Sequence, residues 1–539
     1  MIGTSTWDYV HIQFWIVLLR SLVFVSLGYF CYLIVAVLLS LTSFARLPRL
    51  PLVLEAWAVL DTLFIVFVYL PRRWSLQSAA IHPDAVSREQ RIALSERCLA
   101  TVDNPESYLS KWFMGVPLAQ IRRDNVKEFF CWAFLDGQMT DAELDDEELE
   151  GYVSRMEEKF GIHIPPGRAD IQCLRLTLDR VPMLERSLFW YLVRLAAIGL
   201  TQEGRVDVLQ CIMIVDMATS FRLHWHRFHH YRTPLVRFLH VFPPRTQTLL
   251  SRHVSPSAKV SYWHRPHTST TRLPVLFLHG IGIGLFPYAP FLAELNRPHP
   301  DEDGEPGVIA LEIMPVSFRI TSPALSKHEM RMQIQTILRH HGWTKYVLVT
   351  HSYGSVLATH LLQDPETSAG IVKLVLVDPV TILLHLPDVA YNFTRRVPVR
   401  ANEHQLWHFA SMDMGVSHTL ARHFFWAENI IWKTELPGYI PSTSDASISI
   451  ATGAGTGAGA GTTGSPIIQV QETKPRTAVF LAGHDLIVNT KKVYEYLTES
   501  ELASPHSGTT RVQEGDDSRN EIEDEDEDED ERGNLRLGN

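Results

Sequence analysis

The feature that most restricts the fold of this 539-residue chain is an uncharged apolar run near its start. Residues 21–44 contain no Asp, Glu, Lys or Arg. A helix of about 20 apolar residues crosses the roughly 30 Å hydrocarbon core of a bilayer. Cleavable signal peptides have a basic start and an apolar core of only about 7–15 residues, whereas this chain starts nearly uncharged. We therefore predict an uncleaved transmembrane helix over 21–44 and an integral membrane protein.

A second apolar run covers residues 50–70 and contains two acidic residues, Glu55 near its edge and Asp61 inside it. An aspartate at the middle of a bilayer costs at least about 2.5–3.5 kcal/mol. The run is therefore either a second span with Asp61 paired, or an amphipathic helix that lies at the interface or is buried. Basic residues stand on both sides of it and leave its orientation open. We assign residues 1–73 as the membrane anchor.

Charge is concentrated at the other end of the chain. Residues 514–532 hold 13 acidic residues and two arginines, a balance of −11 that equals the net charge of the whole chain. The remainder is neutral and gives no basic surface that would suggest nucleic-acid binding. We expect residues 513–539 to form a self-repelling, disordered acidic tail.

Cysteine usage bears on the compartment. The five cysteines are widely spaced and include no CxxC pair, which argues against a disulfide framework or a zinc module. This composition favours the cytosolic face of the membrane for the folded region. Asn392 begins a glycosylation sequon, which would matter only if the domain faced a lumen.

Residues 74–254 have helical periodicity and carry no evident chemistry. The string HWHRFHH at 224–230 resembles a histidine box of membrane di-iron oxygenases, but such sites need several boxes from different helices. We interpret it as a basic, aromatic surface at the membrane edge and predict no metal site.

After residue 255 short apolar runs alternate with helical stretches such as 330–340 and 356–362. Runs of Val, Leu and Ile of this length are typical of a parallel sheet that is buried on both faces. The alternation predicts an α/β domain. The expected strands are 259–263, 274–278, 308–313, 346–350, 373–377 and 477–481.

Within this domain the sequence YVLVTHSYGS runs from a strand through Ser352 into a helix, the pattern of a nucleophile elbow. Small neighbours let the strand and helix approach each other at such a turn. Gly354 is present, whereas Thr350 replaces the first glycine of G-x-S-x-G and predicts slightly wider packing there.

A second loop, LHGIGIG at 278–284, follows a strand about 70 residues upstream of the serine. In acyl-transfer enzymes two backbone N–H groups hold the oxyanion, one of them from the residue after the nucleophile. We predict Tyr353 and Ile281 for these roles. A dinucleotide-binding loop is the alternative, but its third glycine is misplaced and no acidic ribose contact is evident.

LFLHGIGIG, THSYG and LAGHDLIV together resemble the α/β-hydrolase superfamily over about residues 255–512. The N-terminal half, with SKWFMG and NVKEFFCWAFL, is similar to fungal membrane-linked α/β-hydrolase proteins without an established substrate. The resemblance implies a mostly parallel sheet with helices on both faces, preceded by a helical region with one or two transmembrane helices.

The resemblance also implies a triad in the chain order Ser, acid, His. Ser352 would be the nucleophile and Asp485 the acid, because Asp485 follows the last predicted strand; Asp378 is the alternative acid. His506 is the only histidine after Asp485, but the polar stretch around it contains no final strand. His351 and His484 flank triad members, and adjacency in sequence is expected to point their side chains elsewhere.

Residues 381–437 are rich in aromatic side chains and predict a lid over an apolar substrate. Ordinary core helices are the alternative for any one of these residues. Residues 442–465, rich in Gly, Ala and Thr, predict a flexible, disordered insert.

Two functions fit these observations. The first is a membrane-anchored serine hydrolase that cleaves a carboxylic ester, which a lipid could supply, without metal or organic cofactor. The second is a catalytically inactive protein of this fold that serves as a binding or scaffold module. The sequence indicates no protein partner.

Overall fold

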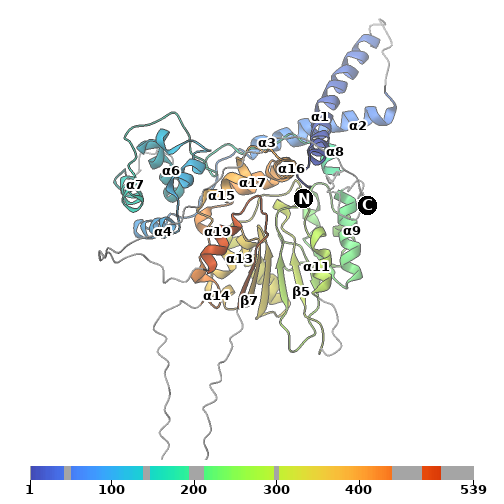
Figure 1. Ribbon diagram of the computed structural model, residues 1–539. Helices are drawn as coiled ribbons and strands as arrows, with labels where there is room; N and C mark the ends of the chain where they lie inside the picture. Colours follow the sequence, from blue (N-terminus) through green and yellow to red (C-terminus); the bar gives the residue numbers. More distant parts are fainter. Residues whose placement is uncertain are drawn as a thin grey trace, which may run out of the picture. The chain divides into compact units, whose positions relative to one another are not determined.

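The computed structural model describes residues 2–41, 50–137, 146–192, 212–295, 303–439 and 476–498. Within these ranges the chain forms an eight-stranded sheet of order β2-β1-β3-β5-β4-β6-β7-β8 (Figure 1). β3 is antiparallel to β1 and β5, and every other pair is parallel, which confirms the predicted α/β class with a mostly parallel sheet. The strands are β1 (His229–Arg232), β2 (His253–Val254), β3 (Tyr262–Arg265), β4 (Val275–Leu278), β5 (Val308–Leu311), β6 (Tyr346–His351), β7 (Ile371–Val377) and β8 (Thr477–Phe480).

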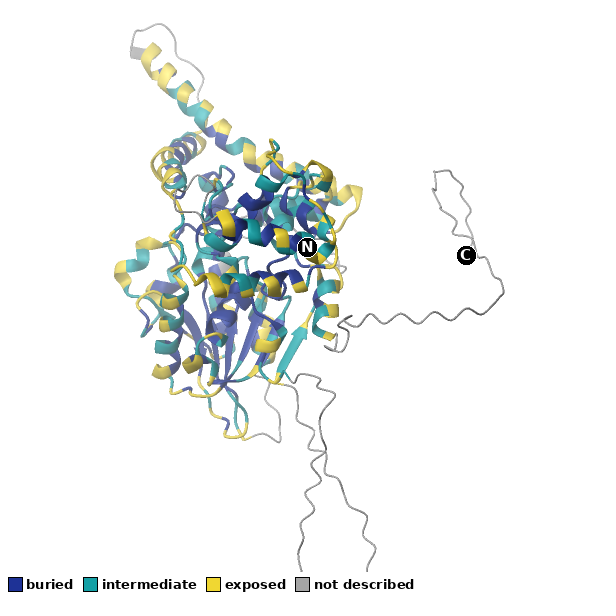
Figure 2. Cartoon of the chain, turned by 90° about the vertical axis from the view of Figure 1, so that its left-hand side faces the viewer, coloured by how far each residue is buried: buried dark blue, intermediate teal, exposed yellow. Residues whose placement is uncertain are grey.

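The central strands are buried on both faces, as their apolar composition requires (Figure 2). Side chains alternate between faces along a strand. In β4, Val275 and Phe277 pack in one core with α11 (Ala289–Glu294). Leu276 lies in another core with α12 (Lys327–His340) and α13 (Gly354–Leu362). Helices α11 and α13 thus cover opposite faces of the sheet (Figure 1).

Each of the six strands expected from apolar runs is present, with small shifts at the ends. Two further strands, β1 and β2, precede residue 255 and extend the sheet. β1 has the sequence HHYR and β2 has two residues, so neither has an apolar run that predicts a buried strand.

The region before the sheet is largely helical and shares its core. Trp112, Phe129 and Trp132 belong to the same cluster of buried residues as Leu348 of β6 and Leu361 of α13. The helices are α4 (Arg88–Ala100), α5 (Pro105–Trp112), α6 (Arg123–Leu135), α7 (Asp146–Phe160), α8 (Leu188–Leu192), α9 (Ile212–Trp225) and α10 (Thr246–Leu250).

Two helices near the start of the chain are long and apolar enough to cross a membrane, by length and composition. The first is α1 (Thr6–Leu41), which begins well before the predicted span 21–44 (Figure 1). The second combines α2 (Leu52–Phe64), a π-helical turn and α3 (Leu70–Ser75). Asp61 is fully buried and accepts a hydrogen bond from the N–H of Leu188, so its carboxylate is bonded to the protein.

The segment predicted as a lid packs against α1. Phe409 and Met414 share a buried cluster with Ile12 and Ile16 of α1. The N–H of Ile2 donates to Gln405 Oε1 at 3.0 Å. The helices of this segment are α15 (Pro387–Thr394), α16 (Ala401–Leu406), a π-helical turn (Trp407–Ser411), α17 (Met414–Arg422) and α18 (Trp426–Asn429).

Two short helices complete the described chain, α14 (Pro365–Ser368) and α19 (Thr490–Thr498). The predicted insert 442–465, the predicted tail 513–539 and His506 lie outside the described residues.

Candidate active site

Ser352 occupies the turn between β6 and α13 with a φ of +50°, in the left-handed region that L residues rarely adopt. Its N–H donates to the carbonyl of Val377 at 2.9 Å. Two glycines make the turn sterically possible. A Cβ on Gly354 would lie 2.3 Å from the Leu278 carbonyl oxygen, and one on Gly280 would lie 2.8 Å from Cβ of Ser352. A strained serine held in this way is the geometry of a nucleophile elbow.

The predicted oxyanion donors lie on either side of this serine. Tyr353 is the N-cap of α13, and Ile281 follows Gly280 in the loop after β4. The N–H groups of Tyr353 and Ile281 form no hydrogen bond with the described part of the chain. Both residues line the cavity that contains Ser352. This arrangement leaves both donors available to a bound carbonyl oxygen.

His279 fixes the loop that carries Ile281. Its Nε2 accepts a hydrogen bond from the N–H of Ile313 at 2.9 Å, and its Nδ1 lies 2.7 Å from the Gly280 carbonyl oxygen. This pattern requires a neutral ring with the proton on Nδ1. Complete burial lowers the pKa of His279 to about 4, so the ring is neutral at pH 7.

Asp378 follows β7 with a φ of +45°. Its Oδ1 accepts the N–H of Ala482 at 2.6 Å, and its Oδ2 lies 3.9 Å from Nε2 of His351. Nδ1 of His351 lies 2.8 Å from the hydroxyl of Tyr288. Burial lowers the pKa of His351 and the carboxylates of Asp378 and Asp485 oppose that shift. Sequence adjacency to Ser352 did not suggest this carboxylate contact.

Asp485 lies after β8 and lines the same cavity. Its Oδ1 accepts the N–H groups of Ile487 and Val488 at 2.6 and 2.8 Å, so the carboxylate closes its own loop. Ser352, both predicted acids, His351 and His484 therefore meet at one cavity. Ser352 Oγ forms no hydrogen bond with the described residues, and the predicted base His506 lies outside them.

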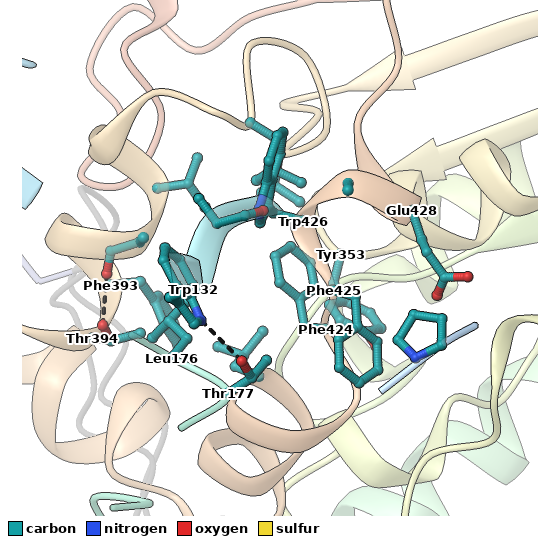
Figure 3. Close-up of a pocket in the computed structure, with 18 of the residues that line it drawn as sticks. Trp132, Leu176, Thr177, Tyr353, Phe393, Thr394, Phe424, Phe425, Trp426 and Glu428 are labelled. Carbon is teal, nitrogen blue, oxygen red and sulfur yellow. Dashed lines mark hydrogen bonds between the residues drawn. The ribbon is translucent and has the colours of Figure 1, made fainter. Parts of the chain in front are cut away.

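The cavity has a volume of about 1340 Å³ and a mainly apolar lining. Figure 3 shows aromatic side chains around it, with the indole N–H of Trp132 donating to Thr177 Oγ1 at 2.9 Å. Apart from Tyr353 of the serine turn, its aromatic lining comes from the segment predicted as a lid and, unexpectedly, from the helical region that we predicted to carry no chemistry. These aromatic residues are Trp112, Trp132, Phe134, Phe393, Phe424, Phe425 and Trp426.

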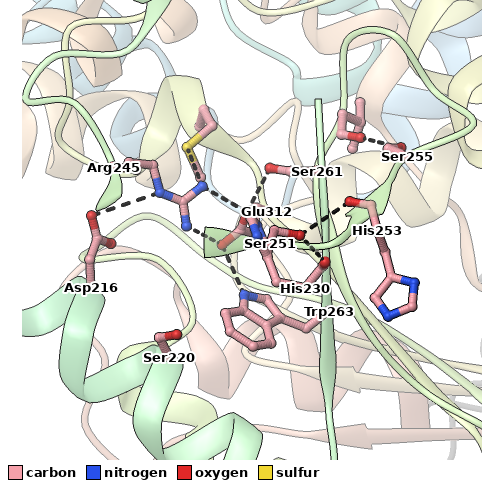
Figure 4. A network of polar contacts seen from close by, with 12 residues as sticks. Asp216, Ser220, His230, Arg245, Ser251, His253, Ser255, Ser261, Trp263 and Glu312 are labelled. Carbon is pink, nitrogen blue, oxygen red and sulfur yellow. Dashed lines mark hydrogen bonds and ion pairs between the residues drawn. The ribbon is translucent and has the colours of Figure 1, made fainter. Parts of the chain in front are cut away.

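Most of the histidine string at 224–230 is exposed, as predicted, with His224, Trp225 and His229 at the surface, but its last residue is buried. His230 of β1 is buried and lies 3.2 Å from the carboxylate of Glu312, which also accepts from Ser261, Trp263 and Arg245 (Figure 4). His230 is thus part of an internal ionic cluster and not of the surface that we predicted. Among the described residues no group of three His, Cys, Asp or Glu side chains is arranged to hold a metal ion.

No protein-family model and no curated protein match the sequence. Solved structures match in part. A membrane phospholipase A, described as a bacterial virulence factor, aligns with 11% identity and a TM-score of 0.26 over 42% of this chain and 71% of that one. A putative lipase from Acinetobacter baumannii aligns with 13% identity and a TM-score of 0.25 over 40% of this chain and 71% of that one. The juvenile hormone epoxide hydrolase of the silkworm Bombyx mori aligns with 15% identity and a TM-score of 0.19 over 22% of this chain and 28% of that one.

These matches are partial and distant, so the fold assignment rests on the geometry of the chain itself. The sheet is mostly parallel, and a strained serine turn links β6 to α13 at its carboxyl edge. A glycine-containing loop after β4 lies beside that serine. Together these features are those of the α/β-hydrolase fold.

Proposed function

We propose that the chain is a membrane-anchored serine hydrolase that cleaves a carboxylic ester of a lipid-like substrate. The observation that carries the proposal is Ser352, which holds a left-handed backbone conformation at the strand–helix turn and borders the large cavity. Strain of this kind is costly and persists where it serves a site.

In the proposed mechanism Ser352 Oγ attacks the ester carbonyl carbon while a histidine accepts its proton. The N–H groups of Ile281 and Tyr353 stabilise the oxyanion. The histidine then protonates the leaving alcohol, and water hydrolyses the acyl-enzyme by the same path. The reaction uses no metal or organic cofactor.

Two carboxylates compete for the role of orienting that histidine. We propose Asp485 as the acid and His506 as the base on chain order. The contact of Asp378 with His351 supports the alternative acid, because Asp378 already faces an imidazole at 3.9 Å. In Asp485, Oδ1 accepts two backbone N–H groups, so Oδ2 would be the oxygen that hydrogen-bonds the catalytic histidine.

We place the hydrolase region on the cytosolic face. Nδ2 of Asn392, the sequon nitrogen that a glycan would modify, donates to the carbonyl of Ile487 at 3.0 Å. Glycosylation would replace one hydrogen of this nitrogen and put a glycan beside the cavity-lining loop. The absence of a glycosidase-sensitive form of the expressed protein would support this placement, and a mobility shift abolished by Asn392→Gln would contradict it.

The proposal is tested by fluorophosphonate labelling of the purified full-length protein. We expect labelling that is lost in Ser352→Ala and retained in Ser368→Ala, a control on α14 outside the cavity lining. Alanine variants of His506, His351 and His484 identify the base as the histidine whose loss abolishes labelling. Comparison of Asp485→Asn with Asp378→Asn identifies the acid in the same way. A folded wild type that does not label would instead support the inactive binding module.

A further inference from the structure

We propose that the substrate is an uncharged ester with a long hydrocarbon chain, of the monoacylglycerol type, and that the cavity discriminates against esters bearing a phosphate. This inference rests on the proposed function and concerns the substrate class of the same site.

The size and lining of the cavity indicate a long apolar group. Pockets for small ligands measure about 300–1,000 Å³, and this one measures about 1340 Å³. Its apolar wall extends from Ser352 and Val380 at the sheet edge to Trp132 and Leu176 of the helical region. A hydrocarbon chain gains free energy over the whole of such a wall, at roughly 25 cal/mol per Å² of apolar surface removed from water.

The charges that line the cavity are mostly negative. Its described lining residues include five carboxylates and two permanent cations. Recognition of a phosphate normally uses arginine or lysine side chains that are free to bind it. The lining carboxylates are Asp84, Asp136, Asp378, Glu428 and Asp485, and the cations are Arg91 and Lys327.

Both cations already have hydrogen-bond partners in the protein. Arg91 donates from Nε and Nη2 to the two carboxylate oxygens of Glu148, at 2.9 and 2.7 Å. The Lys327 ammonium donates to Gln363 Oε1 at 2.8 Å and interacts with the Glu428 carboxylate. Burial lowers the pKa of Lys327. An anionic ester would therefore be desolvated in a cavity whose lining carboxylates outnumber its cations, both of which already have protein partners.

A matched pair of substrates tests the inference: 1-oleoylglycerol and 1-oleoylglycerol-3-phosphate, which share the scissile ester and differ only in the phosphate. We expect full-length protein in neutral detergent micelles to show a roughly tenfold or larger kcat/KM for the uncharged ester, since like charges brought together in a site repel each other. Equal rates, or faster hydrolysis of the phosphate, would overturn the inference.

Charge variants show whether the carboxylates cause the preference. Glu428→Gln combined with Asp136→Asn should shift the ratio of the two kcat/KM values toward the phosphate ester, whereas simple loss of packing would lower both rates together. Glu366→Gln is the control, because Glu366 pairs with Arg339 on the exterior. An unchanged ratio in the double variant would contradict the electrostatic argument.

Labelling of Ser352 by the fluorophosphonate separates this inference from the proposed function. A labelled serine with no turnover of either lipid would overturn the substrate class and leave the hydrolase standing. Binding gives a readout without catalysis. In Ser352→Ala we expect 1-(9,10-dibromostearoyl)glycerol to quench tryptophan fluorescence, and the quenching to fall in Trp132→Phe. No quenching would also overturn the inference.

Discussion

Gly354 is the residue on which the serine turn most depends, because helix α13 begins there against the loop after β4. We expect Gly354→Ala to lower the free energy of unfolding by about 1–3 kcal/mol, as overpacking does in other cores, and to reduce labelling of Ser352. Thermal unfolding and fluorophosphonate labelling measure the two effects. Gly483→Ala is a matched control, since a Cβ there meets nothing within 4 Å. A stable, fully labelled Gly354→Ala protein would refute the steric account.

His279 gives a pH-dependent prediction. Its pKa is lowered to about 4 from an ordinary value near 6.5, so its contribution to stability is complete above pH 6.5 and is lost as the pH falls through about 4. We expect the Tm of the wild type to fall more between pH 7 and pH 4.5 than that of His279→Asn, whose side chain has no such titration. If the Tm of the two proteins changed equally with pH, protonation of His279 would not be a cause of the loss of stability at low pH.

The backbone geometry at several candidate site residues could be predicted from sequence because it is local. Ser352, Tyr353 and Ile281 stand in short motifs whose backbone geometry follows from glycine positions. The contact between His351 and Asp378 was missed because it depends on the alignment of β6 with β7, which the sequence does not state. Thr350, which replaces a motif glycine, is fully buried beside Leu278 in the sheet.

At the scale of elements, the loop segment that carries Leu176 lines the cavity together with Trp132 of α6. We expect Leu176→Trp to shorten the space for a hydrocarbon chain and to lower the ratio of p-nitrophenyl palmitate to p-nitrophenyl butyrate hydrolysis by roughly tenfold, as pocket-filling changes do. Leu178→Trp is the control, because Leu178 packs on the core outside the cavity lining. A ratio that changes equally in both variants would argue against a chain-binding role for this wall.

Strands β4, β5 and β6 were the most predictable elements because they are apolar and almost wholly buried. The aromatic wall from α5 and α6 was not, because Trp112 and Trp132 show only helical periodicity in the sequence. Whether such a face packs on lipid, on a core or around a cavity depends on contacts with residues more than 200 positions away. The hydrogen bond from Trp426 Nε1 to the Ala133 carbonyl, at 2.9 Å, is one such contact.

For the molecule as a whole, the packing of α1 on the helices of residues 401–422 predicts that the first helix supports the candidate site in addition to the membrane attachment that we propose. We expect replacement of residues 6–41 by an unrelated apolar helix of equal length to keep membrane association but slow the labelling of Ser352, because Phe409 and Met414 lose their partners. Sedimentation with membranes and labelling kinetics measure the two properties separately. Unchanged labelling kinetics would show that α1 does not influence the reactivity of Ser352.

The same shared cluster has a consequence for how this chain can diversify over time. An N-terminal segment that serves only for targeting or membrane attachment can be exchanged between genes without loss of the stability or activity of the enzyme. Here Ile12 and Ile16 are neighbours of Phe409 in one core, so a substitution on either side selects for a compensating change on the other. The first helix and the lid should therefore be inherited together, and natural variants should show paired changes at these positions.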